Sequence, residues 1–216
     1  KNKKNQKEIY YYLKIQGLII SYYFDDLHEI KKRYSDINKN IEAIPSRHYL
    51  DLAKIIYEKI SKEEAKDFLL KNLPNSMDLE LSIQNLSQNR FNELKFMFSK
   101  VFFETGYIVA RSQGFESSIP FFWFSLHIDS SNDQARIILS SFFSSVDQVD
   151  IALSILNKNI EKTELWVSIE FERSLLYEKK GDLKSAISLI ENFSKNKAYS
   201  TRTLLRISNI HRRNSN

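Results

Sequence analysis

Small residues recur along the second half of the chain at a constant spacing of 34 positions. Two columns of small residues keep this period: Gly106, Ser140, Ser174 and Ser208, and then Ser118, Ala152 and Ala186. Three columns of large apolar residues keep it too: Phe115, Val149 and Leu183; Phe122, Leu156 and Ile190; Val109, Phe143 and Tyr177. A fixed period of this length indicates tandem structural repeats. Each row holds two helical stretches joined by a short turn, and the small residues let the paired backbones approach closely.

This pattern resembles the tetratricopeptide repeat (TPR) family. The row 167–200 matches best, with Ser174, Tyr177, Gly181, Leu183, Ala186 and Ile190 on signature positions. Rows 99–132 and 133–166 match less fully, and 201–216 is similar to the first helix of a fourth row. The usual tryptophan place holds Phe102, Arg136 and Glu170, and the usual proline place holds Ser130, Glu164 and Ala198. The resemblance implies an all-α, right-handed solenoid of helical hairpins over residues 99–216, with three repeats and a final helix.

A different period marks residues 1–45, which we expect to form a long helical segment. Apolar residues there follow steps of four and three, at Ile9, Leu13, Ile20, Tyr23, Leu27, Ile30, Tyr34, Ile37, Ile41 and Ile44. This is a heptad seam on one or two helices, interrupted once at Gln16. Further apolar residues widen the stripe, so we expect Leu13, Ile20, Tyr23 and Leu27 to pack inside the same chain. A dimer formed through the seam and contact with a membrane surface are the alternatives.

Residues 46–98 read as irregular helices or a degenerate repeat. Ala53 and Ala65 are twelve positions apart, as Ser174 and Ala186 are, but they fall outside the 34-residue register. Further along, the run 121–124 is apolar all round its predicted helix. Such a helix needs cover on both sides, and we expect the N-terminal helices to fold back on it.

Composition narrows the class of protein. The 216 residues are 42% hydrophobic and 27% charged, with only 4 glycines and 3 prolines, as suits a nearly all-helical soluble chain. The absence of cysteine excludes disulfides, thiolate metal sites and a cysteine nucleophile, and it fits a reducing, cytoplasmic location. The net charge of +5 is too diffuse to predict nucleic-acid binding. Richness in Lys, Asn and Ile suggests a bacterial source.

The sequence offers little for catalysis. The four histidines, His28, His48, His127 and His211, have no metal-ligand spacing, and the glycines form no phosphate-binding loop. We therefore expect no enzymatic activity, no metal and no cofactor.

The resemblance implies that first-helix residues facing the solenoid groove bind a protein or peptide partner. By register these are Lys100, Phe103, Tyr107, Arg111, Gln134, Ile137, Ser141, Phe171, Leu175, Lys179, Arg202, Leu205, Arg206, Asn209 and Arg213. The groove floor is apolar, which suits a helix, and its last wall is basic, which suits an acidic partner. Arg202, Arg206 and Asn209 resemble part of the carboxylate clamp of chaperone-binding TPR domains, although Ser141 and Leu175 replace asparagines expected in earlier repeats.

The predicted function is a non-catalytic protein-interaction scaffold or adaptor. The partner is expected in the groove or on the aromatic side formed by residues 121–124. The alternative is an ancillary TPR-like domain of a larger enzyme, such as a bacterial cell-surface polysaccharide glycosyltransferase. Two observations motivate that alternative. The chain starts at Lys1, and it ends where the second helix of a fourth repeat would begin.

Overall fold

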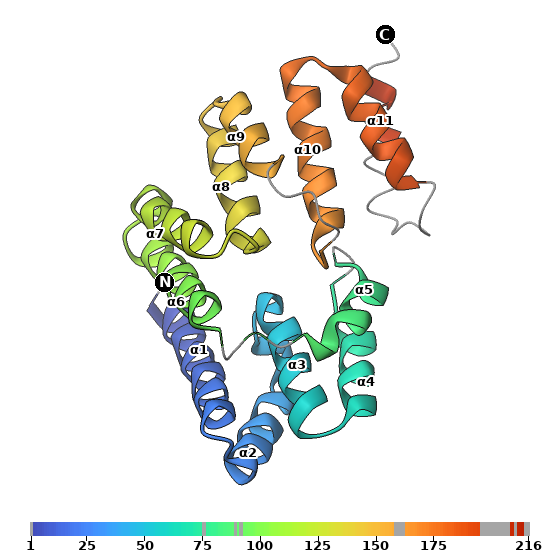
Figure 1. Cartoon of the computed structure of the whole chain (residues 1–216). Coiled ribbons are helices and arrows are strands. Elements are labelled where there is room, and N and C mark those ends of the chain that lie inside the picture. Colours follow the sequence, from blue (N-terminus) through green and yellow to red (C-terminus); the bar gives the residue numbers. More distant parts are fainter. Residues whose placement is uncertain are drawn as a thin grey trace. The chain divides into compact units, whose positions relative to one another are not determined.

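In the computed structural model, every regular element of the described residues is a helix (Figure 1). The described residues are 2–74, 77–88, 90, 93–157, 163–194, 208–209 and 211–213. The predicted all-α fold of helical hairpins is confirmed. The chain divides into two compact units: unit 1 contains Lys1–Pro74 and Leu79–Asp129, and unit 2 contains Asn75–Asp78 and Ser130–Asn216. The division after Asp129 falls at the end of the first predicted repeat.

Unit 1 contains seven α-helices and three short 3-10 turns among its described residues. They are α1 Asn2–Tyr23, α2 Leu27–Asn38, η1 Ile41–Ala43, η2 Ser46–His48, α3 Tyr49–Lys59, α4 Lys62–Asn72, α5 Leu79–Gln84, η3 Asn85–Ser87, α6 Leu94–Ser112 and α7 Phe115–Ile128. The described helices of unit 2 are α8 Asp133–Ser145, α9 Val149–Leu156, α10 Trp166–Lys180 and α11 Leu183–Ser194.

Three successive hairpins, α6–α7, α8–α9 and α10–α11, follow the predicted 34-residue rows (Figure 1). Their small column residues Gly106, Ser118, Ser140, Ala152, Ser174 and Ala186 are all buried, as predicted, whereas Ser208 of the fourth row is exposed. A Cβ atom on Gly106 would come within 2.8 Å of the Phe122 ring, so a residue with a side chain at this position would displace that ring. The small residue on α6 thus makes room for a large side chain of the paired helix.

The turns between the paired helices use left-handed residues. Gly181 ends α10 with φ of 84°, and Asp147, at the matching place between α8 and α9, has φ of 61°. A non-glycine residue in this region is strained, but an aspartate tolerates it better than most. An ion pair of 2.6 Å between the Asp147 carboxylate and Lys179 Nζ accompanies this conformation.

Unit 2 also takes residues from the segment between α4 and α5. The Asp78 backbone N–H donates to the Glu164 carbonyl at 2.9 Å, and the Trp166 indole N–H donates to the Asp78 carboxylate at 2.8 Å. Asp78 is buried by this arrangement. The start of α10 is therefore held by a residue that lies 88 positions earlier in the chain.

The core of unit 1 is built by α1 to α4, but not through the predicted seam. Leu13, Ile20, Tyr23 and Leu27 are exposed, so the expectation that they pack inside the chain is wrong. The buried residues of α1 lie on its other face: Tyr11, Ile15, Leu18, Ile19 and Tyr22.

The reason is the turn between α1 and α2. Asp25 has φ of 56°, which breaks the helix and reverses the chain, and the Asp26 side chain then accepts a bond from the Glu29 N–H to cap α2. After the turn the seam residues Ile30, Tyr34 and Ile37 are buried. The same periodic pattern thus faces the solvent from Leu13 to Leu27 and the interior from Ile30 to Ile37.

The expected cover over α7 is also only partly present. Phe122 is fully buried, but Trp123 and Phe124 are exposed. The N-terminal helices form their own core with α3 and α4, in which Ala53 and Ala65 are both fully buried. The prediction that the N-terminal helices fold back on the run 121–124 is therefore wrong for Trp123 and Phe124, which stay exposed.

Candidate functional site

In the first repeat, the predicted groove floor is occupied by the chain itself. Phe103 is only 1% exposed, and its ring lies 5.1 Å from that of Tyr107 and 5.7 Å from that of Phe122. Lys100 forms an ion pair with the buried Asp51 of α3. These residues were predicted to meet a partner, and in the structure they meet residues of unit 1.

A partly buried arginine–glutamate pair lies next to this floor. Two nitrogens of Arg47, in η2, donate to the two carboxylate oxygens of Glu104 in α6, at 3.3 and 3.0 Å. The Arg47 guanidinium also lies 4.2 Å from the centre of the Tyr107 ring, a cation–π contact. The short segment 47–51 thus covers the inner face of α6, while Arg111, at the end of the helix, stays exposed.

His48 is enclosed in the same cluster. Burial, together with the positive charges of Arg47 and Lys100, lowers the pKa of His48 well below its usual value. Its Nε2 atom lies 3.7 Å from the Glu104 carboxylate, which is already bonded to Arg47. The imidazole is therefore neutral near pH 7.

This burial predicts a loss of stability in acid. Because unfolded histidine binds a proton near pH 6.5 and folded His48 does not, the unfolded state gains protons as the pH falls below that value. We expect the free energy of unfolding to fall by about 1 kcal/mol between pH 6.5 and 5.5, and by up to about 1.4 kcal/mol per pH unit below that. Denaturant titrations at several pH values measure this slope. A His48→Gln variant should lose it, and an unchanged slope in that variant would contradict the assignment.

In unit 2 the predicted groove residues remain partly accessible. Gln134, Ile137 and Ser141 lie on α8, and Phe171, Leu175 and Lys179 lie on α10; all are half-buried except Ser141 and Lys179, which are exposed. Ile137 also packs against the buried core of Ala152, Leu156 and Leu176. Partner binding by this groove stays a prediction.

The basic residues at the end of the predicted groove lie only partly within the described residues. Arg202, Leu205 and Arg206 lie outside the described residues. Arg213 lies 3.5 Å from the Glu178 carboxylate, and its Nε donates to the Asn209 carbonyl at 3.3 Å. The carboxylate clamp therefore also stays a prediction.

An exposed apolar face runs along α6 on the side away from Phe103. Leu94 is 74% exposed and Phe98 57%, and Val101 and Ile108 continue the line at helical spacing. Phe102 extends this face to α7, because its ring centre lies 5.5 Å from that of Phe124, which is 55% exposed. We call Leu94, Phe98, Val101, Phe102, Ile108 and Phe124 the α6–α7 apolar face.

Sequence reasoning identified only one end of this face. The run 121–124 contains Phe124, but the α6 residues were not singled out, although Leu94, Phe98 and Val101 follow the i, i+4, i+7 spacing of a helix stripe. That spacing was the sequence signal that could have identified the exposed face. It was obscured because α6 is apolar on its inner face as well, so its pattern reads as a helix buried all round.

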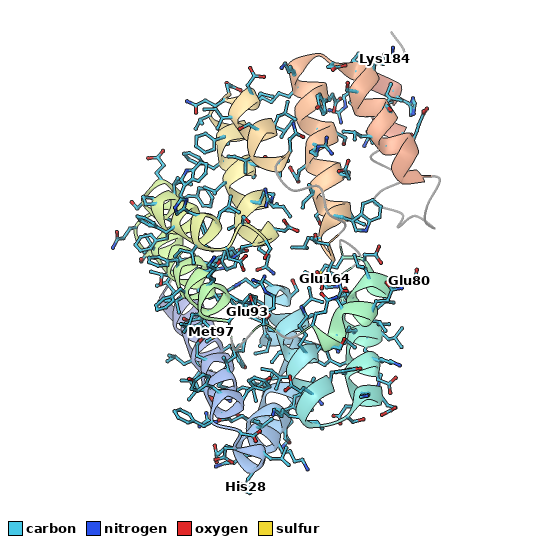
Figure 2. The ribbon with its side chains drawn as sticks, in the orientation of Figure 1. His28, Glu80, Glu93, Met97, Glu164 and Lys184 are labelled. Atoms are coloured by element: carbon cyan, nitrogen blue, oxygen red, sulfur yellow. The ribbon has the colours of Figure 1, made fainter. Side chains whose placement is uncertain are left out.

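A basic residue lies beside this face. Lys95 is exposed and follows Leu94 in the first turn of α6. Glu93, just before the helix, is bonded to Arg90 at 2.7 Å, so its charge is balanced locally. Figure 2 labels Glu93 and Met97 at this end of α6. The surroundings thus favour an acidic flank on anything that covers the apolar residues.

Two kinds of feature are absent from the described part of the chain. No group of three or more His, Asp or Glu side chains there is arranged to hold a metal ion. Among the same residues, no helix combines the length and the apolar character that a membrane crossing requires.

No family model matches the sequence, and no curated protein matches it. A crystal structure of MamA protein is similar to 88% of this chain over 97% of its own length, with 13% sequence identity and a TM-score of 0.38. A likeness of this size carries no argument about function.

Proposed function

We propose that this chain is a TPR-like protein-interaction scaffold that binds a helix of a partner protein on its α6–α7 apolar face. The observation that supports this is the exposure of Leu94, Phe98 and Phe124 on one continuous surface of a single hairpin. Contiguous exposed apolar surface of this kind marks interaction sites in soluble proteins.

The geometry suits a helix as the ligand. Leu94, Phe98 and Val101 are spaced like the apolar positions of a helix, and an amphipathic helix with the same spacing can lie against them. Each well-buried side chain of this size contributes about 1.5–3 kcal/mol relative to its exposed state. Because Lys95 borders the apolar residues, the partner helix is expected to carry Asp or Glu beside its apolar stripe.

The inner face of α6 is less suitable for a partner. Phe103 and Glu104 are buried, and the segment 47–51 already contacts that side. A partner there would have to displace a buried ion pair. The outer face needs no such rearrangement.

The experiment is a selection from a phage-displayed library of amphipathic helical peptides on the intact chain. We expect enrichment of peptides with an apolar i, i+3 or i+4, i+7 stripe flanked by acidic residues. A Phe98→Asp variant should lose these peptides. The matched control is Leu70→Asp, because Leu70 is 61% exposed on α4 of the same unit but lies outside the α6–α7 apolar face.

Three outcomes decide the proposal. Peptides that bind the wild type and Leu70→Asp but not Phe98→Asp support it. Peptides that bind all three equally would contradict it. Peptides that are kept by Phe98→Asp but lost by Phe171→Ala would place the partner in the unit 2 groove, and the α6–α7 apolar face would be withdrawn.

A further inference from the structure

The repeat register supplies a template for what can cover the α6–α7 apolar face. Residues 34 or 68 positions apart occupy the same place in different hairpins, because the rows are copies of one unit. Val101 and Ile108, on the exposed side of α6, therefore correspond to Ile169 and Leu176 on α10. The cover over the α10 pair thus indicates what would fit on the α6 pair.

The α10 pair is covered by a helix of the preceding hairpin. Ile169 is 8% exposed and Leu176 is 3% exposed. Both residues belong to one buried cluster with Leu153 and Leu156 of α9, which lies beside α10 (Figure 1). Large apolar side chains of α9 therefore close the apolar stripe of α10, as stacking does in repeat proteins.

The α6 pair remains open to solvent. Val101 is 50% exposed and Ile108 is 38% exposed. Between them on the stripe, Thr105 donates its hydroxyl to the Val101 carbonyl at 2.7 Å. A partner can therefore bury Thr105 without leaving that hydroxyl unbonded, which would be costly. The stripe on α6 thus has the properties of a stacking surface.

The charges around α9 indicate the direction of the covering helix. Lys180, at the end of α10, pairs with Asp150 in the first turn of α9 at 2.7 Å, so the two helices are antiparallel. Lys179 pairs with Asp147, in the turn before α9, at 2.6 Å. Arg111 occupies the column of Lys179, so α6 keeps a positive charge at this place. A helix that covers α6 in the same way starts near Arg111 and has an acidic residue at its start.

We propose that the partner of the α6–α7 apolar face is a repeat-type helical hairpin of another protein, whose second helix stacks antiparallel on α6 as α9 stacks on α10. This inference rests on the proposed function and narrows its ligand from any amphipathic helix to a hairpin of this kind. The covering helix carries large apolar residues at i, i+4 and i+7, as Val149, Leu153 and Leu156 do on α9. Helix α9 of a second copy cannot serve, because its own Leu153 and Leu156 are buried.

The first test uses a probe copied from α9, and it exploits the absence of cysteine from the chain. The probe is a synthetic, helix-stapled peptide of residues 147–157 with Asp150→Cys. Because the exposed Ser112 occupies the column of Lys180, a Ser112→Cys variant of the intact chain should form a disulfide with this peptide in a thiol redox buffer. A Lys95→Cys variant should form at least tenfold less, because Lys95 lies about 25 Å further along α6 at 1.5 Å per residue. The opposite preference would overturn the antiparallel arrangement.

Matched variants test the apolar contacts themselves. In the Ser112→Cys background, Val101→Asp should lower the disulfide yield at least tenfold, and Leu70→Asp should leave it unchanged. A probe with Leu153→Asp should react as poorly as the Val101→Asp variant does. Circular dichroism checks that each protein variant stays folded. Equal yields from all of these combinations would overturn the proposal.

The remaining outcomes separate this proposal from its neighbours. If the displayed peptides require Phe98 but the α9 probe reacts with neither cysteine variant, the repeat-type ligand is overturned while the proposed function stands. Sedimentation equilibrium of the wild type should show a monomer. A dimer that Val101→Asp converts to monomer would overturn the separate partner, because the occupant would then be a second copy of this chain.

Discussion

Replacing Arg136 by methionine is expected to lower the free energy of unfolding of unit 2 by about 3–5 kcal/mol. The Arg136 guanidinium is buried, donates to the Asp133 carboxylate at 3.1 Å and the Ile155 carbonyl at 3.0 Å, and also bonds the Ser130 carbonyl. Methionine fills similar space but leaves these acceptors without their cationic donor. Removing one member of a buried ion pair is among the most costly single substitutions, because the remaining charge is uncompensated.

Urea denaturation followed by helical circular dichroism measures this effect. The control is Lys180→Met, which removes an exposed ion pair of 2.7 Å with Asp150 in the same unit and should leave stability unchanged. The double variant Arg136→Met with Asp133→Asn should recover part of the loss, because the uncompensated carboxylate is gone. If Arg136→Met and Lys180→Met had equal free energies of unfolding, the buried hydrogen bonds of Arg136 would make no net contribution to stability.

Phe122→Ala is expected to destabilise unit 1 by about 3–5 kcal/mol. Phe122 is fully buried, and its ring lies 5.7 Å from those of Phe103 and Tyr107 and 6.1 Å from that of Phe115. Its ring also lies against Gly106, which has no side chain to fill the space, so its removal opens a cavity between the two helices. The surrounding rings cannot collapse fully into that space.

The matched control is Phe124→Ala, two positions along the same helix. Phe124 is exposed, so its removal should change the free energy of unfolding by less than about 1 kcal/mol while it weakens binding to the α6–α7 apolar face. Thermal unfolding of the two variants gives the comparison. If Phe124→Ala destabilised the chain as much as Phe122→Ala, the face would be part of the core and not a binding surface.

The hairpins could be predicted from sequence because their determinants are local. Close packing of the two helices of a hairpin requires small side chains twelve positions apart, and Ser140 even donates to the Ala152 carbonyl at 3.1 Å across its hairpin. The role of Arg136 could not be predicted in the same way. The sequence shows a departure from the tryptophan of the TPR pattern there, but not that a guanidinium can fill the place by binding backbone carbonyls.

The exposed seam on α1 escaped prediction because one residue decides it. A heptad pattern continues unbroken across Asp25, and only the left-handed backbone at Asp25 turns its two halves in different directions. The groove of the first repeat was hard to predict for a different reason, because a distant segment of the chain contacts it. Register identifies Lys100 and Tyr107 as groove positions, but Asp51 pairs with Lys100 and Arg47 lies over the Tyr107 ring, and no local pattern reveals which distant segment will occupy a surface.

The contribution of Asp78 to unit 2 limits how the gene can be divided for recombinant work. A fragment that starts at Ser130 follows the visible repeats, yet it omits the carboxylate that receives the Trp166 indole N–H and the backbone N–H that bonds Glu164. Such a fragment would expose the start of α10. Appending the tetrapeptide 75–78 through a flexible linker should supply the missing bonds, whereas a peptide with Asp78→Ala should not.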